Sequence, residues 1–310
     1  GSITVTYSYT DGNSCSNSDT ANILVNTAPT VDAGNYGPLC DNVSPITLTG
    51  TPTNSNGTWS GTGVTNNGDG TATFNPAGLS GSITVTYSYT DGNSCSNSDT
   101  ANILVNTAPT VDAGNYGPLC DNVSPITLTG TPTNSNGTWS GTGVTNNGDG
   151  TATFNPAGLS GSITVTYSYT DGNSCSNSDT ANILVNTAPT VDAGNYGPLC
   201  DNVSPITLTG TPTNSNGTWS GTGVTNNGDG TATFNPAGLS GSITVTYSYT
   251  DGNSCSNSDI ANILVNTAPT VDAGNYGPLC DNVSPITLTG TPTNSNGTWS
   301  GTGVTNNGDG

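Results

Sequence analysis

Cysteine has the most reactive side chain in this sequence, and it recurs at a fixed spacing. Two cysteines occur in every copy of an internal repeat, which gives eight in all: Cys15, Cys40, Cys95, Cys120, Cys175, Cys200, Cys255 and Cys280. Paired cysteines in a loop-rich chain dominated by Thr, Asn, Ser and Gly indicate disulfides, and disulfides persist in oxidising compartments. The sequence therefore predicts disulfide chemistry at these positions and an extracellular protein, either secreted or attached to the cell surface.

Aspartate is the only charged residue type. All 20 acidic residues are Asp, and the chain has no Lys, Arg or His, so its net charge is −20. This charge disfavours binding to nucleic acid or to an anionic membrane, and no apolar run is long enough for membrane insertion. The missing residue types exclude His-based triads, P-loops and Schiff bases. Asp91 and Asp99 could act as acid and base, but an active site duplicated in every copy is not expected, so we predict that the chain is not an enzyme.

The internal repeat sets the organisation of the chain. The segment that begins at Gly1 returns at Gly81, Gly161 and Gly241, and Ile260 is the one position at which a copy differs, replacing Thr. Self-similarity at a fixed period indicates an array of one small module. Pro29 and its neighbours interrupt strand pairing and make the best linker. We therefore predict complete modules at 29–108, 109–188 and 189–268, the C-terminal part of a module at 1–28, and the N-terminal part of one at 269–310.

Short β-strands dominate the pattern within a module. Alternating apolar residues predict strands over 46–49, 71–74, 83–89 and 101–105, and shorter strands near 29–33, 36–40, 58–60 and 64–65. The segments Asn67–Gly70 and Asp91–Asn93 contain residues that favour tight turns. About seven short strands with turns between them predict an all-β, antiparallel β-sandwich. Its expected core residues are Ile46, Leu48, Trp59, Phe74, Ile83, Val85, Tyr87 and Ile103.

The order of the motifs resembles that of a known repeat type. The sequence VDAG at 31–34 is followed by LC at 39–40, ITLTGTP at 46–52, GTWSGTGV at 57–64, FNP at 74–76, VTYSYTD at 85–91 and Cys95. This combination resembles the Ig-like or PKD-like repeats of very long secreted, adhesin-like surface proteins of Bacteroidota, and the resemblance covers the whole chain. It implies tandem Ig-like β-sandwiches that form an extended extracellular rod, exported by a type IX route.

Two disulfide pairings are open on this topology. In an Ig-like module Cys40 is expected near one pole and Cys95 near the other, and a disulfide tolerates a Cα separation of only ~7 Å. Stacking modules end to end would instead pair Cys40 with Cys175 and Cys120 with Cys255, and these bonds would staple each junction. The simpler rule, that a small domain carries its own bridge, favours Cys40 with Cys95. Free thiols are the third alternative.

Carboxylates from two modules are expected to meet at the same junction. On the Ig-like topology these are Asp41, Asp112, Asp171 and Asp179. Without basic partners such a cluster either repels or binds a hard cation through oxygen ligands, and Ca²⁺ is the natural choice. The alternative is that these residues only serve turns, where Asp-Gly is common. Calcium is the one cofactor that the sequence predicts.

A modification site is also implied by the resemblance. Asp-Thr-Ala at 19–21 and its repeats resembles the O-glycosylation site of Bacteroidota, which makes Thr20, Thr100 and Thr180 candidates for O-linked glycans and the protein a candidate glycoprotein. In the fourth copy Ile260 removes the hydroxyl. The alternative is that each Thr simply faces solvent on a strand.

These features predict a structural repeat region of an extracellular bacterial surface fibre or adhesin stalk. The chain would act as a stiff spacer, and its first partners would be the neighbouring repeats of the same chain. One alternative is that each copy binds a carbohydrate, a partner protein or a cell surface, with Trp59, Tyr87 and Tyr89 as an aromatic platform. Another is that identical chains associate into filaments, since a broken sandwich exposes edge strands.

Overall fold

The structure is a computed structural model that describes all 310 residues. Its contacts divide the chain into two compact units. One unit contains Gly1–Leu119 and Val123–Val185, and the other contains Cys120–Asn122 and Asn186–Gly310. Every regular element is a β-strand, and no helix is long and apolar enough to cross a lipid bilayer.

Seven strands make up each complete repeat. In the first they are β3 (Leu39–Cys40), β4 (Ile46–Thr49), β5 (Gly57–Gly61), β6 (Val64–Asn66), β7 (Thr71–Phe74), β8 (Gly81–Thr90) and β9 (Ser96–Asn106). In the second they are β10 (Leu119–Cys120), β11 (Ile126–Thr129), β12 (Gly137–Gly141), β13 (Val144–Asn146), β14 (Thr151–Phe154), β15 (Gly161–Thr170) and β16 (Ser176–Asn186). In the third they are β17 (Leu199–Cys200), β18 (Ile206–Thr209), β19 (Gly217–Gly221), β20 (Val224–Asn226), β21 (Thr231–Phe234), β22 (Gly241–Thr250) and β23 (Ser256–Asn266).

The two partial repeats contain less regular structure. Residues before the first complete repeat form a hairpin of β1 (Ser2–Thr10) and β2 (Ser16–Leu24). After β23 the structure has no strand, only an isolated antiparallel bridge between Asp272 and Thr291.

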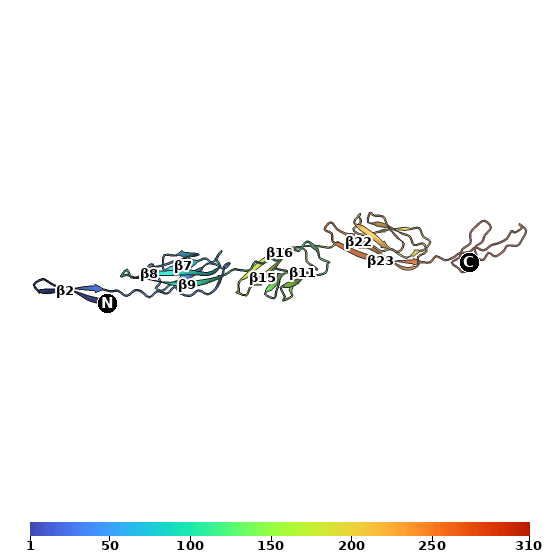
Figure 1. Cartoon of the computed structure of the whole chain (residues 1–310). Coiled ribbons are helices and arrows are strands. Elements are labelled where there is room, and N and C mark those ends of the chain that lie inside the picture. Colours follow the sequence, from blue (N-terminus) through green and yellow to red (C-terminus); the bar gives the residue numbers. More distant parts are fainter. The chain divides into compact units, whose positions relative to one another are not determined.

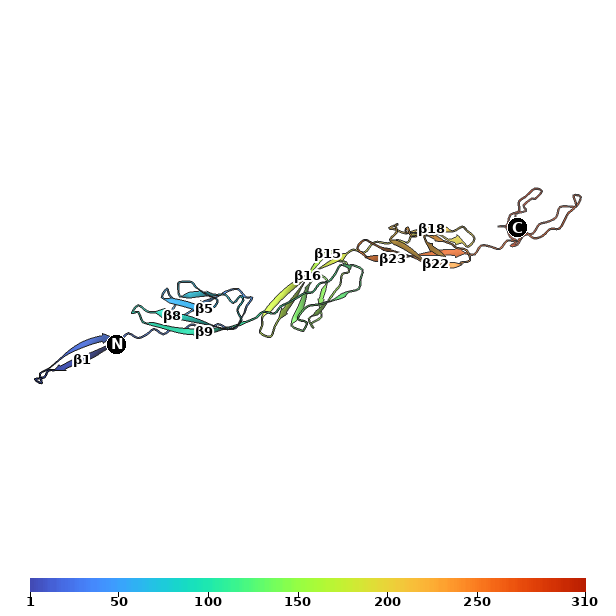
Figure 2. The ribbon, with the colours of Figure 1, turned by 45° about the horizontal axis from the view of Figure 1, so that its top comes forward.

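Each complete repeat is a sandwich of a four-stranded and a three-stranded sheet. In the first repeat the orders are β3-β9-β8-β5 and β4-β7-β6; Figure 1 labels β7, β8 and β9 of this repeat, and Figure 2 labels β5, β8 and β9. All pairs are antiparallel except β3 with β9, where Leu39 and Cys40 lie opposite Val105 and Asn106 in a parallel ladder. The all-β sandwich predicted from the sequence is confirmed.

Alternation along the strands explains why the two sheets face each other. On β8 the side chains of Val85 and Tyr87 are completely buried, while Thr84 on the opposite face donates a hydrogen bond to Asn102 at 2.7 Å. The eight core residues expected from the sequence all belong to this core, although Ile46 and Ile83 are only partly buried. Separate copies of the core occur in the second and third repeats.

The prediction of a first strand at 29–33 is wrong. Residues 29–33 make only an isolated bridge between Asp32 and Thr51, because Gly34 at φ 78° leaves the extended conformation directly afterwards. The expected strand at 36–40 is likewise reduced to Leu39–Cys40. The Asp32 carboxylate accepts the Gly34 N–H at 2.8 Å, which fixes this bend.

Tyr87 is the largest fully buried side chain of the core, and two glycines make room for it. The centroids of the Tyr87 and Trp59 rings are 4.9 Å apart, and the Tyr87 hydroxyl donates a hydrogen bond to the Pro52 carbonyl. A Cβ on Gly50 would lie 2.3 Å from the Tyr87 ring, and one on Gly57 would lie 1.9 Å from its hydroxyl. Both positions therefore require glycine for packing reasons.

The glycine beside the tyrosine hydroxyl gives a test of this packing. Replacing Gly57, Gly137 and Gly217 together by Ala should lower the free energy of unfolding by about 1–3 kcal/mol per repeat, because a well-packed core does not accept an added methyl group. Urea denaturation followed by tryptophan fluorescence measures this change. The matched control replaces Gly37, Gly117 and Gly197 by Ala, where an added Cβ meets nothing within 4 Å. Equal midpoints for the two triple variants would contradict the packing described here.

Candidate functional site: the covalent junction between repeats

Two disulfides are present, and each joins one repeat to the next. Cys40 is bonded to Cys175, and Cys120 to Cys255; in both bonds the Cα atoms are 5.6 Å apart and the sequence separation is 135. The other four cysteines carry free thiols: Cys15, Cys95, Cys200 and Cys280. A partner for any of these four, placed 135 residues away in the same direction as in the two bonds, would lie outside the 310 residues.

The pairing within a repeat, which the rule for small domains favours, is not the one found. Cys40 ends β3 beside Asn106, the last residue of β9, whereas Cys95 precedes the first residue of the same strand. The 11 residues of β9 span about 36 Å at ~3.3 Å per residue. A Cys40–Cys95 bond would therefore have to cross about five times the distance that a disulfide tolerates.

Backbone contacts place Cys40 next to the peptide link that leads to the following repeat. The neighbouring Asp41 donates its N–H to the Asn106 carbonyl at 2.9 Å, and its carboxylate accepts the Ala108 N–H at 2.8 Å. Asp41 thus ties the end of β3 to both sides of the Asn106–Ala108 link. The disulfide and the peptide link leave the repeat at adjacent points.

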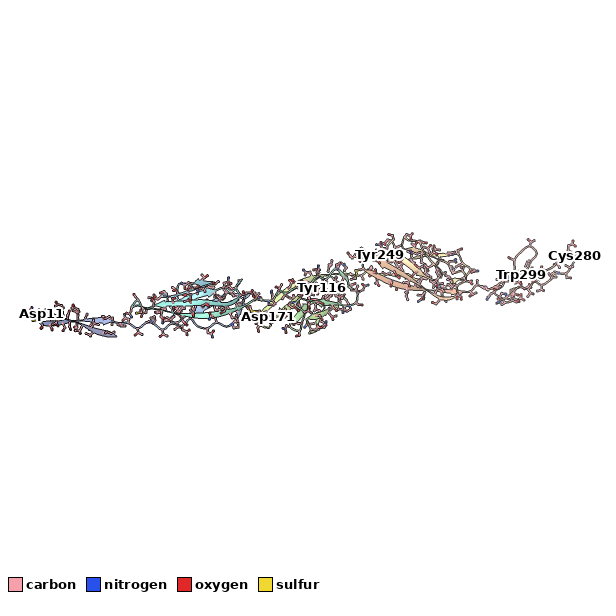
Figure 3. All side chains as sticks on the ribbon, viewed as in Figure 1. Asp11, Tyr116, Asp171, Tyr249, Cys280 and Trp299 are labelled. Carbon is pink, nitrogen blue, oxygen red and sulfur yellow. A yellow bond between two sulfur atoms is a disulfide. The ribbon has the colours of Figure 1, made fainter.

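A tight turn between β15 and β16 positions the partner, Cys175. The Asp171 carboxylate accepts the Cys175 N–H at 2.9 Å, the Asp171 N–H donates to the Cys175 carbonyl at 2.9 Å, and Ser174 adopts a positive φ of 65°. Asp171 is labelled in Figure 3. The side chain of Cys175 is fully buried. Asn42 adds a direct contact across the junction by donating its Nδ2 to the Ser176 carbonyl at 2.8 Å.

The same arrangement recurs around the second disulfide. Asp121 donates its N–H to the Asn186 carbonyl at 2.9 Å and accepts the Ala188 N–H at 2.8 Å. Asn122 donates to the Ser256 carbonyl at 2.8 Å. Asn42 and Asn122 each begin an Asn-Val-Ser sequon, and nothing in the local sequence indicates that they bridge the junction beyond their position directly after the Cys-Asp pair.

Every carboxylate of a complete repeat accepts a backbone N–H. In the first repeat the donors are Gly34 to Asp32, Ala108 to Asp41, Thr71 to Asp69, Cys95 to Asp91 and Ala33 to Asp99, all between 2.8 and 2.9 Å. Two of these bonds, Ala33 to Asp99 and Ala108 to Asp41, connect residues 66 and 67 positions apart. The aspartates therefore hold turns and strand ends in place.

The expected calcium ligands are not gathered into a metal site. No group of three or more His, Cys, Asp or Glu side chains in the chain is arranged to hold a metal ion. Asp41, Asp112, Asp171 and Asp179 accept N–H groups of Ala108, Gly114, Cys175 and Ala113, respectively. Each carboxylate is thus committed to its own backbone bend rather than to a shared cluster.

This arrangement makes calcium chelation testable. We expect EDTA, or added Ca²⁺, to shift the melting temperature no more than NaCl of matched ionic strength does. Each of the three additives should act only by screening the −20 charge of the protein. Differential scanning calorimetry in the three conditions measures the shift. A stabilisation specific to Ca²⁺ and saturating with concentration would show that the chain binds the ion.

Backbone donors also lower the pKa of particular carboxyl groups. The N–H of Ala33, and then that of Thr100, lower the pKa of Asp99 below its ordinary value of 3.8, and Ala113 and Thr180 act in the same way on Asp179. A carboxyl whose pKa is lower in the folded state stabilises the fold above its unfolded pKa, and this contribution is lost as the pH falls through the folded pKa.

Acid titration of the protein and of one double variant checks this assignment. We expect the protein to melt at a higher temperature than the Asp99→Asn, Asp179→Asn double variant at pH 7, because a carboxylate accepts an N–H more strongly than an amide oxygen does. The difference should shrink once the pH falls below roughly 4 and the carboxyls become protonated. Melting curves between pH 2 and pH 7 measure it. A difference that does not change with pH would rule out the ionised acceptor.

The candidate glycosylation positions lie on the outer surface. Thr20 on β2, Thr100 on β9 and Thr180 on β16 are exposed, and Ile260, the equivalent residue of β23, is 57% exposed. Their hydroxyls are accessible, and glycosylation at these positions stays a prediction.

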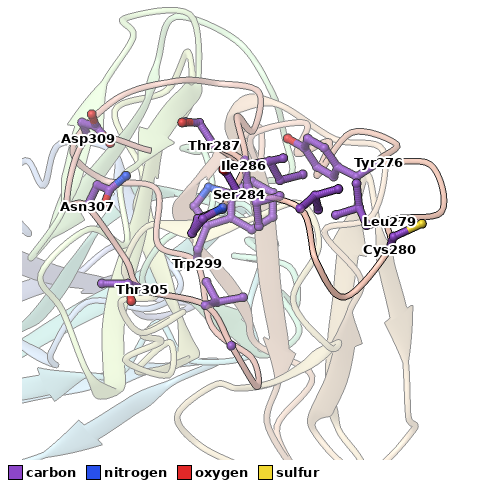
Figure 4. A pocket seen from close by; sticks show the side chains of 15 residues that line it. Tyr276, Leu279, Cys280, Ser284, Ile286, Thr287, Trp299, Thr305, Asn307 and Asp309 are labelled. Atoms are coloured by element: carbon purple, nitrogen blue, oxygen red, sulfur yellow. The ribbon is translucent and has the colours of Figure 1, made fainter.

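A hollow lies in the last partial repeat. Tyr276, Leu279, Ile286 and Trp299 line it, as Figure 4 shows. In the first complete repeat the equivalent residues pack in the core that contains Val85 and Tyr87 of β8 and Ile103 of β9. The sequence after 269 contains no counterpart of those strands, so the hollow is the inner face of an incomplete sandwich rather than a built ligand site.

Comparison with known proteins gives likeness only to solved structures. No family model matches the chain, and no curated protein matches it. A structure of the N-terminal eight Ig domains of Down Syndrome Cell Adhesion Molecule is 11% identical with a TM-score of 0.35, covering 85% of this chain and 43% of that one. The chain thus spans less than half of that structure.

Two further solved structures are similarly distant. Drosophila N-cadherin EC1-4 is 12% identical with a TM-score of 0.25, covering 86% of this chain and 83% of that one. The human desmocollin-1 ectodomain is 8% identical with a TM-score of 0.26, covering 85% and 68%. With TM-scores this low, the strand order within each repeat remains the evidence for the fold.

Proposed function

We propose that this chain is a structural repeat region of an extracellular surface fibre or adhesin stalk, and that it acts as a stiff spacer. The observation that carries the proposal is the double covalent link between consecutive repeats. At the junction after the first complete repeat, the peptide link at 106–108 runs beside the Cys40–Cys175 disulfide. Two covalent links at neighbouring points resist both bending and twisting more than a single flexible linker does.

The composition supports an extracellular location. Disulfides persist outside the reducing cytosol, and a chain without Lys or Arg contains no site for trypsin-like cleavage. Both properties suit a protein exposed to proteases at a cell surface. The sequence frame 29–108, 109–188 and 189–268 is our proposal for the repeat boundaries, and each repeat would add roughly 35 Å, given 11 residues in its longest strand.

Recognition of sugars by the repeats finds no comparable support. Trp59 and Tyr87, the best candidates for an aromatic platform, are buried in the core, and Tyr89 is half-buried beside them. The expected partners of a repeat are therefore the neighbouring repeats of the same chain. Attachment to other molecules or surfaces would belong to other parts of such a fibre.

Electron microscopy of the purified 310-residue protein tests the spacer role. We expect elongated particles with a narrow distribution of end-to-end distance, and a broader distribution for a variant in which Cys40, Cys120, Cys175 and Cys255 are all replaced by Ser. A variant with Ser at the free Cys95 is the control and should match the original. Compact particles in every sample would refute the spacer, and equal distributions in all three would show that the disulfides do not stiffen it.

A further inference from the structure

The two disulfides are interlaced along the sequence. The first closes the segment from Cys40 to Cys175 and the second closes the segment from Cys120 to Cys255, so the segments share residues 120–175. A bond within each repeat would instead close segments that do not overlap. The segments overlap because the two partners of a bond are 135 residues apart, which is more than the one repeat between Cys40 and Cys120.

Overlap shortens the covalent route through the protein. Along the backbone, the sequence separation of Cys40 and Cys255 is 215 (255 − 40). Through the bonds, the route crosses from Cys40 to Cys175, runs back along the backbone to Cys120, and crosses to Cys255. The backbone part of this route has a separation of only 55 (175 − 120).

From this connectivity we propose that the paired junction disulfides form a redundant limit on how far the array can be pulled out. Under tension from the two ends, the shortest covalent route becomes taut first. Residues 41–119 and 176–254 then bear no load at full extension, so unfolding of either segment adds no length. Only the segment 120–175, which contains β11 to β15, is stretched between the bonds.

Redundancy appears when one bond is lost. If only Cys40–Cys175 remains, the route crosses that bond and then follows the backbone from 175 to 255, a separation of 80. If only Cys120–Cys255 remains, the route follows the backbone from 40 to 120, and the separation is again 80. Losing either bond therefore raises the separation from 55 to 80, while losing both raises it from 55 to 215. One break therefore lengthens the route by 25 (80 − 55), whereas loss of both bonds lengthens it by 160 (215 − 55).

This property is distinct from the stiffness proposed above. A spacer resists bending at rest, whereas the interlaced bonds set the maximum length under load. The chain could lack the first property and keep the second, so the two proposals can fail separately.

Single-molecule pulling of the whole chain, held at its first and last residues, tests the proposal. The four free cysteines are replaced by Ser throughout, which prevents new pairings, and the quantity measured is the final contour length. Four proteins are compared: one with both bonds, one with Cys40→Ser and Cys175→Ser, one with Cys120→Ser and Cys255→Ser, and one with all four changes.

We expect strongly non-additive gains in length. Relative to the protein with both bonds, each variant that lacks one bond should gain about 90 Å, and the variant that lacks both should gain about 580 Å, at ~3.6 Å per extended residue. Treating the intact protein with a dithiol, which becomes oxidised as both disulfides become thiols, should produce the same gain of about 580 Å. The final length depends on connectivity alone, so a variant that folds poorly still gives a valid reading.

Other outcomes would overturn the proposal. The same gain of about 200 Å in all three variants would mean that the only bond formed is Cys120–Cys175 within one repeat, because each of the variants removes it. A chain with all four cysteines that already reaches the length of the quadruple variant would mean that the bonds are not formed.

Discussion

The parallel pairing of β3 with the end of β9 is the constraint on which the rest of the array depends. It places Cys40 opposite Asn106, at the end of the repeat from which the chain leaves. The length of β9 then places Cys95 at the other end. A repeat with one cysteine at each pole cannot close on itself, but it can bond to the repeat on either side. The strand order thus converts a two-cysteine module into a continuous covalent chain.

The hydrogen bonds of Asp41 and Asp171 hold the backbone beside the two bonded cysteines, Cys40 and Cys175, in place. Asp41 fixes the end of β3 against the link between repeats, and Asp171 fixes the turn that presents Cys175. Two of the four carboxylates that the sequence offers as calcium ligands thus hold the backbone on either side of a disulfide.

Much of the fold could be predicted from the sequence because the strands alternate cleanly. Leu48, Phe74, Val85 and Tyr87 are apolar residues at period two, and all are buried. The strand expected at 29–33 failed because Gly34, which looks like an ordinary turn residue, bends the chain one residue after Ala33. Disulfide connectivity stayed open because it depends on which ends of the strands are adjacent. The partners of Asp41 and Asp99 lie 67 and 66 positions away along the chain, and no local pattern reveals such contacts.

The protein carries a net charge of −20 and has no basic side chain to neutralise it. Two such chains that approach side by side therefore repel. At physiological ionic strength the Debye length is about 8 Å, so the repulsion acts only near contact, and in dilute media of about 0.01 M it reaches about 30 Å. Chains that carry this charge would therefore keep farther apart in dilute media than in concentrated salt.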